Sequence, residues 1–181
     1  MFFFQLFILL VSMILLSFSI SGNGLIITRN FKRNFFLDFF FGLIVTSLII
    51  TVIHFFFKIN LLISCVIFSV GLILFLKNIN LNFLKYLDKK IIIYPIILLF
   101  LLPMLVSQKY HEDFGYYHLP YALAFLENKI VFGFANIDKS YVYNSIWLNL
   151  NSIFFLNNNN FNFLTLPSFI LFIFFLYHIL K

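Results

Sequence analysis

The sequence predicts an all-α fold, a polytopic transmembrane helical bundle of about five spans with a large extracytoplasmic loop containing juxtamembrane amphipathic helices. Two observations predict it. Of 181 residues, 63% are hydrophobic and only 10% are charged, whereas soluble domains are about half apolar and a quarter charged. The apolar residues also gather in runs close to the roughly 20 residues that cross a bilayer. A soluble globular protein is therefore excluded.

The first three apolar runs predict three helices. The run over residues 2–21 follows no positively charged segment and ends without a small-residue cleavage site, which indicates a retained helix rather than a signal peptide. The second and third runs, residues 39–57 and 61–76, are separated by only three residues. So short a connection predicts an antiparallel helical hairpin.

The fourth run covers residues 91–106 and contains Pro95 and Pro103, which a membrane helix tolerates because neighbouring helices satisfy the freed carbonyls. The fifth run covers residues 163–180. These runs predict a four-span region over residues 1–106, an extracytoplasmic loop over residues 107–162, and a fifth transmembrane helix over residues 163–181.

The distribution of lysine and arginine predicts how the spans are oriented. Residues 22–38 carry three basic side chains and residues 77–90 carry four, so both segments are expected to be cytoplasmic. Residues 107–162 carry three lysines against four acidic side chains, and the turn at 58–60 carries a single lysine. Both are expected outside. The predicted location is the cytoplasmic (inner) membrane, with the N-terminus outside and Lys181 inside.

The formal net charge of +6 does not indicate nucleic-acid binding, because the basic residues lie in short clusters between apolar runs. Membrane lipids are the expected partners instead. The single cysteine, Cys65, lies inside an apolar run. It therefore excludes an intramolecular disulfide and is expected to behave as a small buried hydrophobic residue.

The long loop contains two candidate helices. Within residues 144–155 an apolar stripe and a polar stripe recur at helical spacing, which predicts an interfacial amphipathic helix with Trp147 as its aromatic anchor. Residues 112–128 are less regular, because Gly115 and Pro120 interrupt them, although Pro120 is suited to open a helix over the second half. The apolar stripe is Ile146, Trp147, Leu150 and Phe154, and the polar stripe is Ser145, Asn149 and Ser152.

Polar side chains are densest over residues 109–118, KYHEDFGYYH, directly after the fourth run. A carboxylate at the membrane surface is partly desolvated, which suits it to act as a general base. If the segment is helical, Asp113 and Tyr117 share one face and Glu112 points elsewhere. Asp113 is therefore the preferred candidate for chemistry.

Less specific interpretations of residues 109–118 are also considered. The segment after the fourth run is also what a polar loop leaving the bilayer looks like. Its histidines and carboxylates lack a helical ligand pair, so no metal ligand or cofactor is assigned, with a divalent metal kept as an alternative. His54 and His178, near the ends of apolar runs, are expected at the interface, and Asp38 and Asp88 are expected to balance their basic loops.

Residues 111–155 resemble the first large extracytoplasmic loop of bacterial polytopic membrane proteins related to the GT-C glycosyltransferases. These proteins take a sugar from a polyprenyl-phosphate carrier and place it on an acceptor outside the cytoplasmic membrane. Where that pattern has a histidine and an arginine after Asn136, this chain has Asp138 and Ser140, and Lys139 is a shifted basic group. The matching positions are Asp113, Tyr117, His118, Gly133, Ala135, Asn136, Asn144, Ser145 and Trp147.

The resemblance implies roles for the loop residues in sugar transfer for cell-envelope glycan synthesis. Asp113 would be the catalytic base, and Lys139 would contact the phosphate of the polyprenyl-phosphate-linked sugar. It also implies that the chain is the N-terminal portion of a larger protein, with further transmembrane segments or a subunit completing the fold. The implied substrate-binding residues are Glu112, Tyr117, His118, Asn136, Lys139 and Asn144.

Two alternatives from other classes remain open. A non-catalytic membrane subunit or a fragment of a lipid-linked-sugar flippase would need polar residues inside the spans to line a path, and the apolar runs carry few. A small structural membrane protein would need no site at all. It would leave the clustering of Glu112, Asp113, Tyr117 and His118 unexplained.

Overall fold

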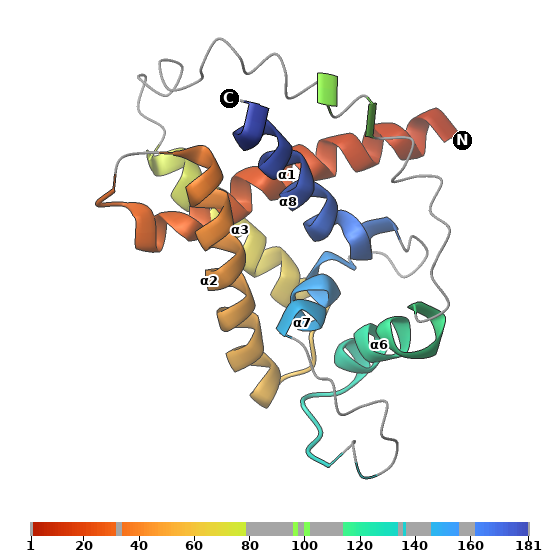
Figure 1. Ribbon diagram of the computed structural model, residues 1–181. Coiled ribbons are helices and arrows are strands. Elements are labelled where there is room, and N and C mark those ends of the chain that lie inside the picture. Colours follow the sequence, from red (N-terminus) through yellow and green to blue (C-terminus); the bar gives the residue numbers. More distant parts are fainter. Residues whose placement is uncertain are drawn as a thin grey trace.

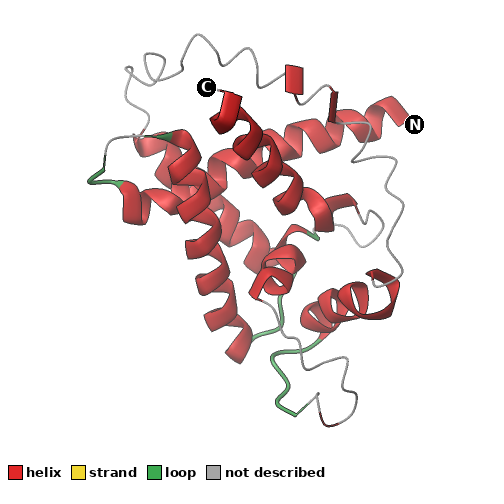
Figure 2. Cartoon of the chain, in the orientation of Figure 1, coloured by secondary structure: helices red, strands yellow, loops and turns green. Residues whose placement is uncertain are grey.

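The computed structural model describes residues 2–31, 34–78, 96–97, 100–101, 114–133, 136, 146–155 and 162–180. Every regular element within these ranges is a helix (Figure 2). The all-α class predicted from the sequence is therefore confirmed for the described part of the chain.

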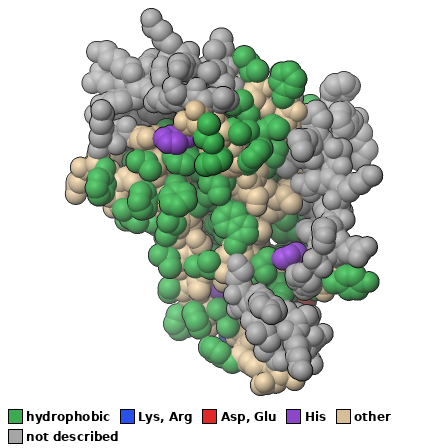
Figure 3. Space-filling model, viewed as in Figure 1, with side chains coloured by type: hydrophobic (Ala, Val, Ile, Leu, Met, Phe, Trp, Pro, Cys, Tyr) green, Lys and Arg blue, Asp and Glu red, His purple; other side chains and the backbone are tan. Residues whose placement is uncertain are grey.

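Four long helices dominate the arrangement: α1 (Phe2–Thr28), α2 (Phe35–Phe56), α3 (Leu61–Asn78) and α8 (Asn162–Leu180) (Figure 1). Each is long and apolar enough to cross a membrane. Hydrophobic side chains also cover most of the described surface that faces the viewer in Figure 3. The chain therefore has the build of a multi-pass membrane protein. The span expected over residues 91–106 lies almost wholly outside the described residues.

Two asparagines mark helix starts. The Asn34 side-chain oxygen accepts from the Phe36 amide at 3.0 Å, which caps the first turn of α2. The Asn60 side-chain oxygen likewise accepts from the Ile63 amide at 2.9 Å at the start of α3. These caps place both helix starts within a few residues of the apolar runs that predict them.

Glycines let α1 approach its two neighbours closely. A Cβ atom added to Gly22 would lie 1.8 Å from the Gly71 carbonyl oxygen on α3, and one added to Gly42 of α2 would lie 1.9 Å from the Ile20 carbonyl oxygen. Small residues allow such backbone contact between membrane helices. α1 continues past its predicted end at residue 21 as far as Thr28. Its glycines let it pack directly against α2 and α3.

The helices α2 and α3 run in opposite directions, as expected of a hairpin, but they pack little against each other. The chain reverses between the two helices, so that α3 runs back from the end of α2 (Figure 1). Both helices pack extensively on α1 and make few direct contacts with each other. The short connection makes the chain reverse direction, whereas the close contacts at the glycines pack both helices against α1.

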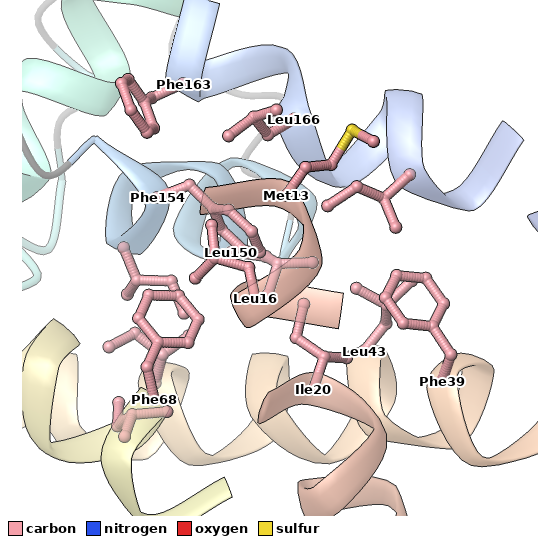
Figure 4. Packing of buried hydrophobic residues seen from close by; sticks show 14 of the residues in the cluster. Met13, Leu16, Ile20, Phe39, Leu43, Phe68, Leu150, Phe154, Phe163 and Leu166 are labelled. Carbon is pink, nitrogen blue, oxygen red and sulfur yellow. The ribbon is translucent and has the colours of Figure 1, made fainter. Parts of the chain in front are cut away.

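The apolar core includes a short helix from the long loop, α7 (Ile146–Phe154). Figure 4 shows its Leu150 and Phe154 among core side chains of the long helices. Its polar residues Asn149 and Ser152 are also buried, at 3% and 0% exposure. The helix is confirmed, but it does not lie on the surface as an interfacial amphipathic helix would, because α2, α3, α6 and α8 pack around it.

The two ends of the bundle gather different segments. At one end the His178 ring near the end of α8 stacks on Phe36 at the start of α2, with ring centroids 4.7 Å apart. At the other end, the Ile59 amide in the α2–α3 turn donates to the Phe125 carbonyl in helix α6 (Leu119–Glu127) at 3.0 Å. This arrangement agrees with the expectation that the α2–α3 turn and the long loop share one side.

Candidate functional site

The described part of the long loop begins with a π-helical turn, η2 (Phe114–His118), which leads into α6. Pro120 lies in the first turn of α6, where its missing amide hydrogen costs nothing. The expected helix start at Pro120 is thereby confirmed. α6 ends where the Asn128 amide donates to the Ala124 carbonyl at 2.8 Å.

The segment after α6 is attached to the last turns of α2. The His54 Nε2 atom lies 3.0 Å from the Asn128 carbonyl oxygen, and the Ile130 amide donates to the His54 carbonyl at 3.0 Å. His54 therefore holds residues 128–130 through both its ring and its backbone. It is fully buried within the protein, with its ring edge-on to Phe125, and its interfacial level in the membrane stays a prediction.

A turn closes this segment. Gly133 has a φ of +90°, a conformation that favours glycine, and its carbonyl accepts from the Asn136 amide at 2.9 Å. The turn leaves Phe132 exposed, with its ring centroid 6.1 Å from that of Phe55. The segment 128–133 thus forms a wall that stands against the end of α2.

Between this wall, α2, α6 and α7 lies a cavity of about 390 Å³. It combines aromatic and aliphatic side chains with two amides, the two hydroxyls of Thr51 and Tyr121, and one lysine, which is the composition typical of small-molecule sites. The residues that line it are Thr51, Phe55, Tyr121, Ala124, Phe125, Asn128, Lys129, Ile130, Val131, Phe132, Gly133, Ile146 and Asn149.

One wall of the cavity carries a short hydrogen-bonded chain. The Thr51 hydroxyl donates to the Ser47 carbonyl at 2.7 Å, and the Asn149 Nδ2 atom donates to the Thr51 hydroxyl oxygen at 3.4 Å. Asn149 lies beside the His54 imidazole. In this geometry the Asn149 Oδ1 and His54 Nδ1 atoms are both buried and have no hydrogen-bond partner.

The structure describes only some of the site residues that the sequence predicted. His118 is exposed at the end of η2, and Asn136 is exposed beside the cavity-lining Gly133. The backbone of Tyr117 lies in η2, but its side chain is outside the described part. The structure thus brings one predicted site residue, Asn136, to the edge of the cavity. Glu112, Asp113, Lys139 and Asn144 lie outside the described residues.

Several cavity residues were missed in the sequence. Lys129 is the cation at this cavity, although the resemblance had directed attention to Lys139. Asn128 and Lys129 directly follow the helix that Pro120 starts, so their place at a helix end was available as a signal. Asn149 belongs to the predicted polar stripe of residues 144–155, and its place at the cavity depends on the packing of α7 against α2.

Cys65 is exposed on α3 and is not, as the sequence had predicted, buried inside the described part of the protein. Within the described ranges, no group of three or more His, Cys, Asp or Glu side chains is arranged to hold a metal ion. Asp38 is buried at 3% exposure and accepts a hydrogen bond from the Thr28 hydroxyl. Asp38 thus joins α1 to α2 inside the bundle, a contact that the sequence did not predict.

The fold and the cavity together define a multi-pass helical membrane protein whose long loop packs into one end of its bundle. Residues 6–181 match the family described as "Domain of unknown function (DUF8201)", and the chain belongs to this family. Comparison with curated proteins and with solved structures gives no match. The family match includes α1 from residue 6 onward and every later described helix, so the bundle and the cavity wall form part of one family unit.

Proposed function

We propose that this protein is a membrane glycosyltransferase of the GT-C type, which transfers a sugar from a polyprenyl-phosphate carrier during cell-envelope glycan synthesis. The observation that carries the proposal is the cavity at the end of α2, because it combines aromatic faces, amide groups and Lys129. Aromatic faces suit the apolar side of a sugar ring, amides suit its hydroxyls, and a lysine suits a phosphate.

The reaction needs few groups from the protein. The acceptor hydroxyl oxygen attacks the anomeric carbon, the bond from that carbon to the carrier phosphate oxygen breaks, and the acceptor proton passes to a carboxylate. Asp113 is the proposed base, because it precedes the η2 and α6 elements that lead to the cavity. Lys129, together with Lys139, would stabilise the negative charge on the departing polyprenyl phosphate.

The distribution of lysine and arginine supports an orientation in which the cavity opens on the outer side of the cytoplasmic membrane. At that level it would meet the head group of a lipid-linked sugar, with membrane lipids around the bundle. Further transmembrane segments or a partner subunit would complete the enzyme, as the resemblance implies.

A flippase receives less support from the polar residues within the spans. The Asn23 side chain donates to the Thr46 hydroxyl at 3.0 Å, and the Ser19 hydroxyl donates to the Phe68 carbonyl at 2.6 Å. These pairs join neighbouring helices, and none of these residues lines the described cavity. They therefore act as contacts between helices rather than as the lining of a path.

The test is the substitution Asp113→Asn. Membranes that contain either the unaltered protein or the variant are given native polyprenyl-phosphate sugars, and the release of polyprenyl phosphate is measured. Loss of a general base predicts a fall in rate of about 100-fold or more, with unchanged membrane insertion. The matched control is Glu127→Gln, an exposed carboxylate at the end of α6 outside the cavity lining. Equal rates for the unaltered protein and Asp113→Asn would contradict the assignment.

A further inference from the structure

The cavity shares one face of α2 with a stripe of exposed apolar side chains. Thr51 and Phe55 line the cavity, and residues at intervals of three and four positions lie on the same face of a helix. When these intervals are followed back toward the start of α2, they lead to apolar side chains that are exposed on the protein surface. The α2 stripe defined in this way consists of Leu37, Phe40, Ile44, Leu48 and Phe55.

The α2 stripe is long enough to follow most of the depth of a membrane. From residue 37 to residue 55 it covers about 27 Å at a rise of about 1.5 Å per residue, close to the roughly 30 Å of a bilayer's hydrocarbon core. Because α2 is long and apolar enough to cross the membrane, its exposed apolar face is suited to contact with lipid. One wall of the cavity therefore continues directly into a lipid-facing surface.

The opposite rim of the cavity is also apolar, although it belongs to the segment that follows α6. Val131 and Phe132 line the cavity and are exposed, Phe132 at 81%, and the Phe132 ring centroid lies 6.1 Å from that of Phe55. Exposed apolar groups that gather in this way mark surfaces that meet a membrane or a partner, and aromatic rings are favoured at the membrane interface. Since Phe55 belongs to the α2 stripe, the apolar rim and the lipid-facing surface are continuous.

Lys129 supplies positive charge at this opening. Among the described residues that line the cavity, it alone is charged. Its backbone is held in place, because the neighbouring Asn128 and Ile130 are both hydrogen bonded to His54 near the end of α2. A lysine at the membrane surface attracts anionic lipid head groups. The opening thus combines a lipid-facing apolar surface with a positive charge at its end.

We propose that the cavity opens sideways into the bilayer and binds the anionic head group of a lipid whose hydrocarbon chain lies along the α2 stripe. The negative group lies beside Lys129, and Phe55 and Phe132 flank the point at which the chain leaves the cavity. Lipid tails are as apolar as the side chains of the stripe, so the chain itself adds little affinity. Selection among lipids therefore comes from the head group.

This inference deepens the proposed function, because it assigns a place to the hydrocarbon chain of the lipid-linked sugar, and it rests on that function only in the choice of the natural lipid. The two are tested separately. Transfer is tested by Asp113→Asn, whereas lipid binding is measured with a probe that carries no sugar. A protein that holds the probe and transfers no sugar would keep the lipid site and lose the proposed activity.

The experiment measures contact between α2 and a brominated lipid by the quenching of tryptophan fluorescence. Leu48→Trp lies on the α2 stripe, and Ile49→Trp, at a position that is also exposed, lies roughly 100° round the helix at nearly the same depth. Each is combined with Trp147→Phe, which removes the native tryptophan, and is placed in phosphatidylcholine vesicles. The probes are hexadecyl phosphate and hexadecanol, both brominated on the part of the chain next to the head group.

Ordinary lipid reaches both positions, whereas a chain held by its head group touches only the α2 stripe. Hexadecyl phosphate should half-quench Leu48→Trp at a mole fraction about 3-fold or more below that for Ile49→Trp, as for one exposed ion pair, and hexadecanol should quench both alike. Lys129→Gln should abolish the difference. Lys58→Gln, which removes an equal charge from the exposed α2–α3 turn outside the cavity lining, should preserve it. Equal quenching of both positions by hexadecyl phosphate, or the same preference with hexadecanol, overturns the proposal.

Discussion

Single glycines decide how closely the helices of this bundle approach. A Cβ atom added to Gly24 would lie only 1.8 Å from the Asp38 carbonyl oxygen. A Cβ atom added to Gly22 or Gly42 would likewise clash with backbone atoms of a neighbouring helix. Because backbone atoms cannot move aside as a side chain can, the helices must separate if any of these glycines gains a methyl group.

Gly42→Ala should therefore destabilise the protein by about 1–3 kcal/mol or more, the range for overpacked interiors. The measurement is the midpoint of thermal unfolding in detergent, followed by circular dichroism. Gly115→Ala is the control, because nothing lies within 4 Å of a Cβ atom at Gly115. Equal midpoints for the two variants would contradict the close contact of α1 with α2.

The contact between Thr28 and Asp38 could not be predicted from residue type and sequence position alone. Asp38 follows a basic loop, and the sequence alone predicts only that it balances the charge of that loop. The structure buries it because Gly24 allows α1 to lie on the first turns of α2, which brings the Thr28 hydroxyl to the Asp38 carboxyl group. A pairing across two helices depends on their spacing, which no local pattern contains.

Thr28→Val should lower stability by about 1–3 kcal/mol, because it removes a donor to a buried carboxyl group while keeping the volume of the side chain. Thr28→Ser retains the hydroxyl and should stay closer to the unaltered protein. Both variants can be compared by unfolding with increasing denaturant in the same detergent. If valine and serine have the same effect, the hydroxyl contributes nothing to stability.

Among the elements, α7 shows most clearly the limit of helical periodicity. The pattern over residues 144–155 correctly predicts a helix, because side chains three and four positions apart share a face whatever surrounds them. It does not reveal what each face meets. In the structure the face with Asn149 and Ser152 is turned into the protein, where Asn149 donates to Thr51 of α2 and Ser152 to the Leu148 carbonyl.

The attachment of the cavity wall to α2 depends on the His54 ring. His54→Leu removes the hydrogen bond to the Asn128 carbonyl, so the backbone amides of residues 128–133 should exchange with deuterium at least several-fold faster. Mass spectrometry of peptides from this segment measures the change. The control is His178→Leu at the opposite end of the bundle, beside Phe36. Unchanged exchange in the His54→Leu variant would show that the ring does not hold the wall.

At the scale of the whole molecule, the apolar runs predicted four of the helices, because the need to satisfy backbone groups in lipid leaves little choice of structure. The predicted alternation of the loops between the two sides of the membrane also agrees with the structure, because the α2–α3 turn and the long loop lie at the same end of the bundle. The cavity could not be predicted in the same way. It is formed by α2, α6, α7 and residues 128–133, and their meeting depends on tertiary contacts such as those of His54 and Ile59.

The most direct test of the central claim, that this bundle crosses the membrane with its cavity on the outer side, is the labelling of two single-cysteine proteins. Phe132→Cys lies at the cavity and Phe31→Cys lies in the α1–α2 connection, and both positions are well exposed. With Cys65→Ser in the background, an impermeant thiol reagent should label Phe132→Cys in intact cells and Phe31→Cys only after lysis. Labelling of both positions in intact cells, or the reverse pattern, would contradict the account.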